Sequence, residues 1–309
     1  MAQVLVTGAG GFVGTAVVKQ LLVAGWDVRA GTRRGGTVAD APGVALNVTD
    51  RASCDHAMAG TAVIVHCAVG NAAVTVGGTQ TVMAAAGPRR VVHLSSVAVY
   101  GATPGAVDED APLPAATGYA AWKQTAEHAC GPNAVRLRPA IIYGPGAALF
   151  VDKLLARMQA GRWGTFGADA DGLCNPVHVD DVARAACLAL TAEVGGQAFN
   201  IDAGTPPLTW NAWFALLARH AGLALPEYPP GRLRRWSRLA VPAKALARLA
   251  PALRPALSGA MLAPAASEVA LFRLHATYPA ARAGARAALG WQPLVPLETG
   301  VAQAVAAWR

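Results

Sequence analysis

The chain has 309 residues, of which 54% are hydrophobic and 14% charged, and its 26 basic and 18 acidic side chains give a formal net charge of +8. This composition allows one large folded domain or two modest ones and excludes an intrinsically disordered chain. No uninterrupted apolar run reaches the roughly 18 residues that a transmembrane helix needs, and no basic segment precedes the first predicted strand, so we expect a cytoplasmic protein.

The first fifteen residues contain a nucleotide-binding pattern. Residues 3–7 are an apolar run of strand length, a turn with Gly8, Gly11 and Gly14 follows, and apolar residues recur at helical spacing from 15 to 26. Glycine lets a turn approach a pyrophosphate, whose charge is held by free N–H groups at a helix start. We predict a dinucleotide site that includes Phe12 and Val13, and the alternative is an ordinary tight turn.

The second predicted strand, residues 27–32, ends at Arg33 and Arg34. Sites that prefer NAD usually carry Asp or Glu at this end to bond the ribose 2′-hydroxyl, whereas Asp27 lies at the opposite end. Guanidinium groups bind a 2′-phosphate with paired hydrogen bonds. We therefore predict NADP (NADPH) as the cofactor, with NAD as the alternative cofactor and a solvated loop as the alternative structure.

Alternating strands and helices continue along the chain. Strands are predicted at residues 44–46, 62–68 and 90–94, with helices beginning near residue 50 and spanning 76–86. This alternation predicts an α/β fold with a doubly wound parallel sheet, in which ligands lie beyond the carboxyl ends of the strands. We place four further cofactor-binding residues at these ends: Asn47, Val48, Cys67 and Ala68. His66 is expected to be a hydrogen-bonded core residue.

A candidate catalytic group follows the strand at 90–94. Ser95 and Ser96 occupy its carboxyl end, and Tyr119 and Lys123 lie in a helix predicted from 119 to about 130. Positions i and i+4 share one helical face, so both side chains can point into one crevice. A serine at a strand end together with Tyr-x-x-x-Lys forms a more specific pattern than either element alone.

Taken together, these motifs resemble the extended short-chain dehydrogenases/reductases, often grouped as NAD-dependent epimerase/dehydratase proteins. The matching segments are residues 7–14, 93–101, 119–123, 137–146, 177–181 and 288–293. The resemblance implies a Rossmann domain over residues 1–145, to which 176–204 return, and a smaller, mostly helical substrate lobe formed mainly by 146–309. It also implies a homodimer.

The resemblance assigns roles to the catalytic candidates. Tyr119 would be the general acid or base, and Lys123 would favour its phenolate and bond the nicotinamide ribose. Ser96 would bond the substrate oxygen, because the family's catalytic hydroxyl lies four residues before the tyrosine that corresponds to Tyr100. No metal site is predicted, because the five cysteines are scattered and lack Cys-x-x-Cys spacing.

Departures from the family pattern narrow the class of substrate that we expect. Members that act on nucleotide sugars tend to carry Asn at the position of Ile141 and Arg at that of Cys174, and both groups serve the diphosphate. Thr75, directly before the helix at 76–86, also stands where the family has Asn. The loop after Cys67 is short. We expect a mostly apolar carbonyl or alcohol substrate and an open crevice, with His178 in a structural role.

The C-terminal part is predicted to be helical, with one amphipathic face at residues 210–217 and a last helix at 297–308. Seven prolines are expected to divide the region between into short helices: Pro226, Pro229, Pro230, Pro242, Pro251, Pro255 and Pro264. Residues 230–260 carry no acidic residue but seven basic ones: Arg232, Arg234, Arg235, Arg238, Lys244, Arg248 and Arg254. Because this charge is local, no nucleic-acid partner is expected.

The same segment carries leucines at roughly helical spacing: Leu246, Leu249, Leu253 and Leu257. We favour a helix packed on the lobe with a solvated basic face over a membrane-surface or lid segment. The leucines are expected to offer an apolar substrate a wall.

Three classes of function fit the sequence. An NADP-dependent oxidoreductase that interconverts a ketone or aldehyde and an alcohol is favoured. A nucleotide-sugar epimerase or dehydratase is second, and it is disfavoured by Ile141 and Cys174. A non-catalytic NADP-binding regulatory module is third, and it is disfavoured by the presence of Ser96, Tyr119 and Lys123 together.

Overall fold

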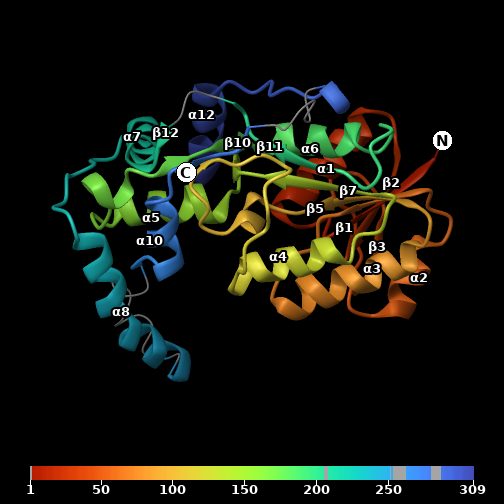
Figure 1. The fold of residues 1–309 in the computed structure, drawn as a ribbon, viewed down its shortest axis with the longest axis horizontal. Helices are drawn as coiled ribbons and strands as arrows, with labels where there is room; N and C mark the ends of the chain where they lie inside the picture. Colours follow the sequence, from red (N-terminus) through yellow and green to blue (C-terminus); the bar gives the residue numbers. More distant parts are fainter. Residues whose placement is uncertain (1, 205–207, 251, 253–261, 280–286) are drawn as a thin grey trace.

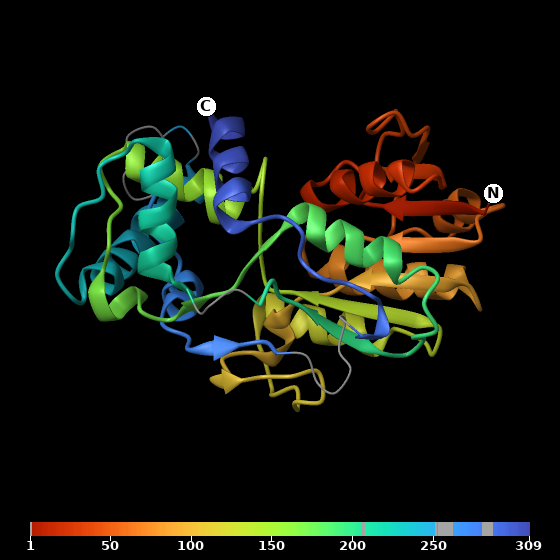
Figure 2. The ribbon, with the colours of Figure 1, turned by 90° about the horizontal axis from the view of Figure 1, so that it is seen from above.

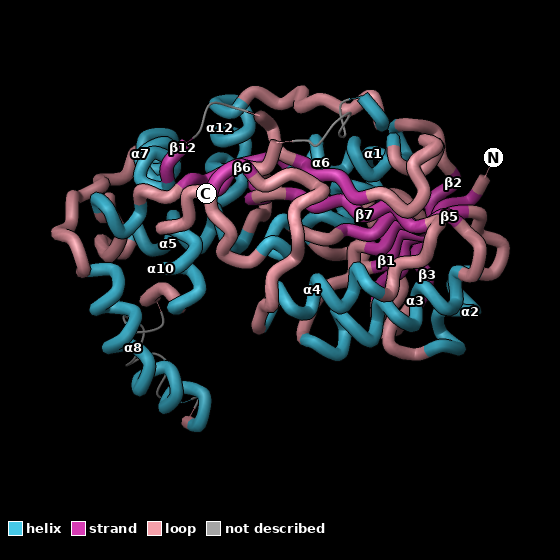
Figure 3. The backbone as a smooth tube through the Cα atoms, in the orientation of Figure 1, coloured by secondary structure: helices cyan, strands magenta, loops and turns pink. Residues whose placement is uncertain are grey.

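The computed structural model describes residues 2–204, 208–250, 252, 262–279 and 287–309, without the side chains of 247 and 248. A seven-stranded sheet, every neighbouring pair of which is parallel, forms its centre (Figure 3). The strands are, in spatial order, β11 (Ala198–Ile201), β7 (Ala134–Pro139), β5 (Arg90–Leu94), β4 (Val63–His66), β1 (Gln3–Thr7), β2 (Asp27–Thr32) and β3 (Gly43–Ala45).

The sheet is doubly wound, as predicted. Strand order reverses between β1 and β4, so the crevice for a ligand lies beyond the carboxyl ends of these two strands. Helices α1 (Phe12–Val23) and α6 (Val179–Leu188) pack on one face. Helices α2 (Arg51–Met58), α3 (Gly78–Ala86) and α4 (Gly118–His128) cover the other (Figure 1). Apolar cores on both faces explain why the central strands are continuous apolar runs.

A second lobe has its own core, rich in aromatic side chains. Figure 2 shows it beside the sheet, with the C-terminal helix α12 (Leu297–Trp308) in it. Trp163, Trp210 and Phe214 lie at the centre of this core. The other helices of the lobe are α5 (Lys153–Gln159), α7 (Trp210–Ala221), α8 (Arg232–Leu249) and α10 (Ala266–Phe272).

Short strands and helical turns connect the two parts. The two-stranded pairs are β8 (Ile141–Tyr143) with β10 (Pro176–His178), β9 (Leu173–Cys174) with β12 (Leu208–Thr209), and β6 (Gly105–Ala106) with β13 (Ala276–Thr277). The helical turns are η1 (Ala73–Gly77), η2 (Val97–Tyr100), η3 (Ala148–Asp152) and η4 (Gly167–Ala170). The domain boundaries proposed from the sequence remain predictions.

Some predicted bounds move by a few residues. Helix α1 begins at Phe12 rather than at residue 15, because the backbone turns helical directly after Gly11. It ends at Val23, since Gly25 adopts a positive φ of 80° and the amide of Trp26 donates to Leu21 O.

The expectation of short helices after residue 230 is wrong for residues 232–249, whereas α10, which is seven residues long and follows Pro264, agrees with it. Helix α8 runs through 18 residues with Pro242 inside it. Pro242 is exposed, and so is Arg238, the residue whose carbonyl loses its helical partner, so this part of the helix is open to water. Pro251 and Pro255 lie outside the described residues.

The prediction that leucines of residues 230–260 form an apolar wall for a substrate is also wrong for the leucines that the structure describes. Leu246 and Leu249 are 45% and 85% exposed, so they do not line a pocket in the described structure. Leu253, Leu257 and Arg254 lie outside the described residues.

Candidate active site

Ser96, Tyr119 and Lys123 meet at the carboxyl end of β5. Ser96 precedes η2, where its hydroxyl accepts from the amide of Ala98 at 3.1 Å, and it lies close enough to the Tyr119 phenol to influence its pKa. Lys123 lies one turn after Tyr119 in α4, with its Nζ 5.9 Å from the centre of the tyrosine ring. Ser95 is buried, and its hydroxyl has no hydrogen-bond partner among the described residues. The structure therefore brings together the three residues chosen from the sequence.

Burial shifts the pKa values of Tyr119 and Lys123 in opposite directions. Lys123 is 3% exposed, and burial lowers its pKa from 10.5 to about 8. The pKa of Tyr119 is raised by burial, and the nearby Ser96 hydroxyl offsets part of that rise, although the residue as a whole is 44% exposed. In the protein alone, Lys123 does not bring the tyrosine to a phenolate. Tyr119 is a protonated phenol at neutral pH.

A buried ion pair fixes helix α4 against the sheet. Glu127, one turn after Lys123, accepts two hydrogen bonds from Arg138 in β7, at 2.9 and 2.6 Å. Arg138 also donates to the Tyr100 hydroxyl at 2.8 Å, and that hydroxyl donates to Asn200. This network was not predicted, although an arginine in a strand of a buried sheet is a sequence signal for a buried partner.

The glycine turn lies at the carboxyl end of β1 and has no room for a side chain at Gly8 or Gly14. Gly8 has a φ of 65°, and an added Cβ would lie 2.8 Å from the backbone of Ala68. An added Cβ on Gly14 would overlap the carbonyl oxygen of Gly8. Gly11 caps α1 without a side-chain hydrogen bond, which leaves amides at the helix start free for an anion. These residues fit the pyrophosphate of a dinucleotide, and Phe12 and Val13 form the first turn after them.

The end of β2 borders a surface hollow of about 480 Å³. Its lining contains Arg33 and Asn47, which were predicted, and three residues that were not: Gly70, Asn71 and Val74. Arg34 is exposed but does not line it, and Val48 is buried in the core, where its side chain packs against Gly78. Cys67 and Ala68 are half-buried beside the glycine turn, and burial raises the pKa of the Cys67 thiol to about 12.

Two histidines have the structural roles expected from the sequence. His66 is buried between the hydroxyls of Thr7 and Thr79, at 2.7 and 3.0 Å, and burial lowers its pKa to about 3. His178 accepts from the amide of Asp180 and thereby caps α6. A larger hollow of about 600 Å³ lies at the ends of α3 and α4, but none of the candidate catalytic residues lines it.

The two positions that depart from the sugar-nucleotide pattern belong to the lobe. Cys174 is 1% exposed within the lobe core, and Ile141 is half-buried against the same core. The segment after α10 covers this edge, because the amide of Leu173 donates to Leu274 O at 2.8 Å and the side-chain amide of Asn175 donates to Ala276 O at 2.9 Å. This edge presents no charged donor to a ligand at the position of Cys174.

Comparison with known families agrees with this geometry. The profile of the NAD dependent epimerase/dehydratase family matches residues 4–202. The chain belongs to this family. It is an extended short-chain dehydrogenase/reductase enzyme that uses a nicotinamide cofactor.

Curated relatives within the family carry out different reactions. The chain is 29% identical to a UDP-glucose 4-epimerase from Mycolicibacterium smegmatis over 72% of its own length and 64% of the epimerase. It is 29% identical to a 2-alkyl-3-oxoalkanoate reductase from Stenotrophomonas maltophilia over 66% of the chain and 71% of the reductase. It is 32% identical to sterol demethylase protein B from Methylococcus capsulatus over 63% and 68%.

Solved structures share the fold. A UDP-glucose 4-epimerase from Brucella ovis in complex with NAD superposes with a TM-score of 0.75 at 21% identity, over 100% of this chain and 98% of the epimerase. A UDP-glucuronic acid 4-epimerase from Bacillus cereus, in complex with UDP-glucuronic acid and NAD, gives a TM-score of 0.73 at 19% identity, over 99% and 98%. At this level of identity the likeness establishes the architecture alone. Among the described residues, no helix is both long enough and apolar enough to cross a membrane.

Proposed function

We propose that the protein is an NADP-dependent oxidoreductase that interconverts a ketone or aldehyde and an alcohol on a mostly apolar small molecule. The observation that carries the proposal is that Ser96 lies close enough to the Tyr119 phenol to influence its pKa, with Lys123 one turn after Tyr119 on the same face of α4. A substrate oxygen placed beside these two hydroxyls would meet a hydrogen-bond donor and a proton donor together.

Each residue has a distinct task in this reaction. NADPH, when bound, supplies the hydride for the carbonyl carbon. Ser96 holds the carbonyl oxygen, and Tyr119 gives that oxygen its proton, so that an alcohol results. Lys123, held in place by its hydrogen bond to Leu94 O, offsets the negative charge left on the tyrosine oxygen. In the oxidative direction the proton moves back to Tyr119.

The cofactor would lie along the carboxyl ends of β1 and β2. Gly8, Gly11 and Gly14 would hold the pyrophosphate, and the hollow beside Arg33 would receive the adenosine end. Arg33 is exposed, has no acidic neighbour in the lining of that hollow, and suits a 2′-phosphate. These features favour NADP over NAD.

Several observations favour an apolar substrate. Cys174 and Ile141 bring no charge to the substrate side, and a diphosphate buried without donors would be poorly compensated. The loop from residue 67 to 72 between β4 and η1 is short, and Tyr119 is partly exposed. The names of two relatives, an oxoalkanoate reductase and a sterol demethylase protein, also indicate substrates with large hydrocarbon parts.

A panel of ketones and aldehydes tests the proposal through the loss of NADPH absorbance. We expect turnover with alkyl or polycyclic ketones, and calorimetry of the NADPH complex should show no binding of UDP or dTDP-glucose. Micromolar binding of a sugar nucleotide, with none of the ketones bound, would overturn it.

The second candidate is a nucleotide-sugar epimerase, which the match to the Mycolicibacterium smegmatis UDP-glucose 4-epimerase favours. Its site would also use Tyr119 and Lys123, but it needs donors for the diphosphate. An epimerase would convert a sugar nucleotide without net oxidation of NADPH. The two candidates are therefore separated by incubation with UDP-glucose and analysis of the sugar product.

A further inference from the structure

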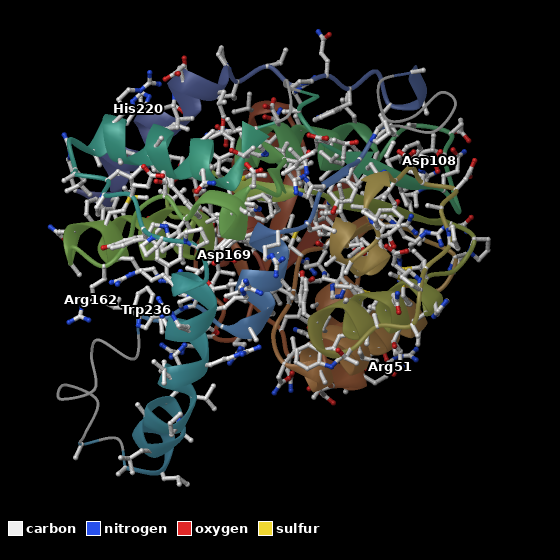
Figure 4. The ribbon with its side chains drawn as sticks, turned by 60° about the vertical axis from the view of Figure 1, so that its left-hand side comes forward. Arg51, Asp108, Arg162, Asp169, His220 and Trp236 are labelled. Atoms are coloured by element: carbon white, nitrogen blue, oxygen red, sulfur yellow. The ribbon has the colours of Figure 1, made fainter. Side chains whose placement is uncertain are left out.

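Helix α8 is anchored to the lobe by its first half. Asp169 accepts from the amide of Gly231 at 2.6 Å and pairs with Arg234 at 3.3 Å. Leu233 and Ala240 are buried, and the ring of Trp236 packs on Trp163 (Figure 4 labels Asp169 and Trp236 at this base). The second half extends away from the lobe (Figures 1 and 3), and Lys244 within it donates to Ala263 O at 2.6 Å. The helix is thus anchored mainly through its first half, and one side of its second half is exposed.

Exposed leucines lie along one side of α8 between residues 239 and 249. Leu239, Leu246 and Leu249 are 77%, 45% and 85% exposed. Residues seven apart lie on one side of a helix, and Leu249 follows Leu246 by three, so the three leucines form one stripe. Exposed leucines in a contiguous group mark a contact surface more often than isolated ones do.

The charges on this face are all of one sign. Arg235 and Arg238 are exposed beside the leucine stripe, and no acidic side chain among the described residues pairs with either. Residues 230–260 contain no Asp or Glu. A second copy that docked through α8 would therefore bring like charges together. A nucleic acid would use the arginines but not the leucines. Leucines among unpaired arginines match the interface of an anionic bilayer.

We propose that α8 is the docking surface for an anionic phospholipid bilayer. The helix lies along the headgroups, with Leu239, Leu246 and Leu249 in the boundary of the acyl chains and Arg235 and Arg238 against phosphate. This binding goes beyond the proposed oxidoreductase activity and does not depend on it, because none of these residues belongs to the candidate active site.

Vesicle flotation with the full chain tests the proposal directly. We expect it to bind vesicles of phosphatidylcholine mixed with phosphatidylglycerol, to bind phosphatidylcholine alone far less, and to lose binding as salt is raised. Leu239→Ser and Leu246→Ser should each lower the partition coefficient about tenfold, because the free energy gained by transferring a leucine side chain from water to the acyl chains is lost. Arg235→Gln and Arg238→Gln should each lower it about fivefold.

Matched controls separate this face from general surface effects. Val23→Ser removes an exposed apolar side chain on α1, and Arg51→Gln removes an exposed arginine on α2, on another part of the surface (Figure 4). Both should bind vesicles as the wild type does. A Leu249→Trp variant should shift its emission to the blue with anionic vesicles and be quenched by brominated lipid.

Three outcomes would overturn the proposal. They are absence of binding to anionic vesicles, equal losses in the Val23 and Arg51 controls, and a concentration-dependent dimer, seen by sedimentation without lipid, that Leu246→Ser dissociates. The last would identify a second copy as the occupant. NADPH turnover on a water-soluble ketone should be the same for all α8 variants, so failure of the membrane proposal is distinguishable from failure of the proposed activity.

Discussion

Lys123 donates a hydrogen bond from Nζ to the backbone oxygen of Leu94, at 2.6 Å, directly before the two serines at the end of β5. The bond joins α4 to the strand end and fixes the distance between Tyr119 and Ser96. Because the ammonium group is buried, its pKa falls to about 8. The candidate active site therefore contains a lysine whose amine is protonated less readily in the folded protein than in the unfolded chain.

The first prediction concerns stability against pH. The pKa of Lys123 is 10.5 in the unfolded chain and about 8 in the folded protein, so between these values the unfolded chain binds more protons. The free energy of unfolding therefore rises with pH from about 8 to 10.5. Below that window, burial of the charged lysine lowers the free energy of unfolding by its full amount, on the order of 3 kcal/mol. Lys123→Met should lack this rise. Urea unfolding of both proteins across that window measures the difference, and parallel curves would contradict it.

The second prediction concerns the proton donor. Tyr119→Phe should lower turnover by about 10²–10⁴-fold while leaving the dissociation constant of NADPH unchanged. Burial raises the pKa of Tyr119, so the reductive rate should not fall as pH rises through neutrality. Tyr228→Phe, which removes a hydroxyl that donates to Gly161 O in the lobe, is the matched control. Near-normal rates in the Tyr119 variant would show that another group donates the proton.

The sequence predicted the sheet well, because strand and helix periods are local properties. Residues 3–7, 27–32 and 90–94 were predicted as strands and are β1, β2 and β5. A helix was predicted in the basic segment, but its continuation through Pro242 in α8 was not, because a proline normally ends a helix. Pro242 is exposed, which allows water to satisfy the freed carbonyl.

The sequence predicted which residues form the candidate site, but it did not predict the direction of each side chain. Ser96, Tyr119 and Lys123 converge because strand end and helical spacing fix them. In the predicted cofactor-binding region, the side chains of adjacent residues lie on different sides: Asn47 lines the hollow, and Val48 is buried in the core. No periodicity in a turn of two or three residues decides which of them points outward, and tertiary packing makes that choice.

The third prediction uses two glycines of one turn. An added Cβ on Gly14 would overlap Gly8 O, whereas one on Gly10 would meet only Thr32 Cγ2 at 3.7 Å. Gly14→Ala should displace the turn, lower the melting temperature and weaken NADPH binding by more than tenfold, since the pyrophosphate needs this backbone path. Gly10→Ala should leave both nearly unchanged. Equal effects of the two substitutions would mean that the cofactor does not approach this turn.

The last prediction separates two adjacent arginines. Arg33 lines the hollow at the end of β2 and Arg34 does not, although both are exposed. A charged hydrogen bond to the 2′-phosphate contributes about 1.5–3 kcal/mol, so NADPH should bind roughly ten- to a hundredfold more tightly than NADH. Arg33→Ala should remove most of this preference by weakening NADPH alone, because NADH has no phosphate to lose. Arg34→Ala carries the same change in net charge and should keep most of the preference, which makes it the control for long-range electrostatics. Fluorescence titration of each protein with NADPH and NADH measures the ratios, and equal affinity of the wild type for the two cofactors would refute the assignment of NADP.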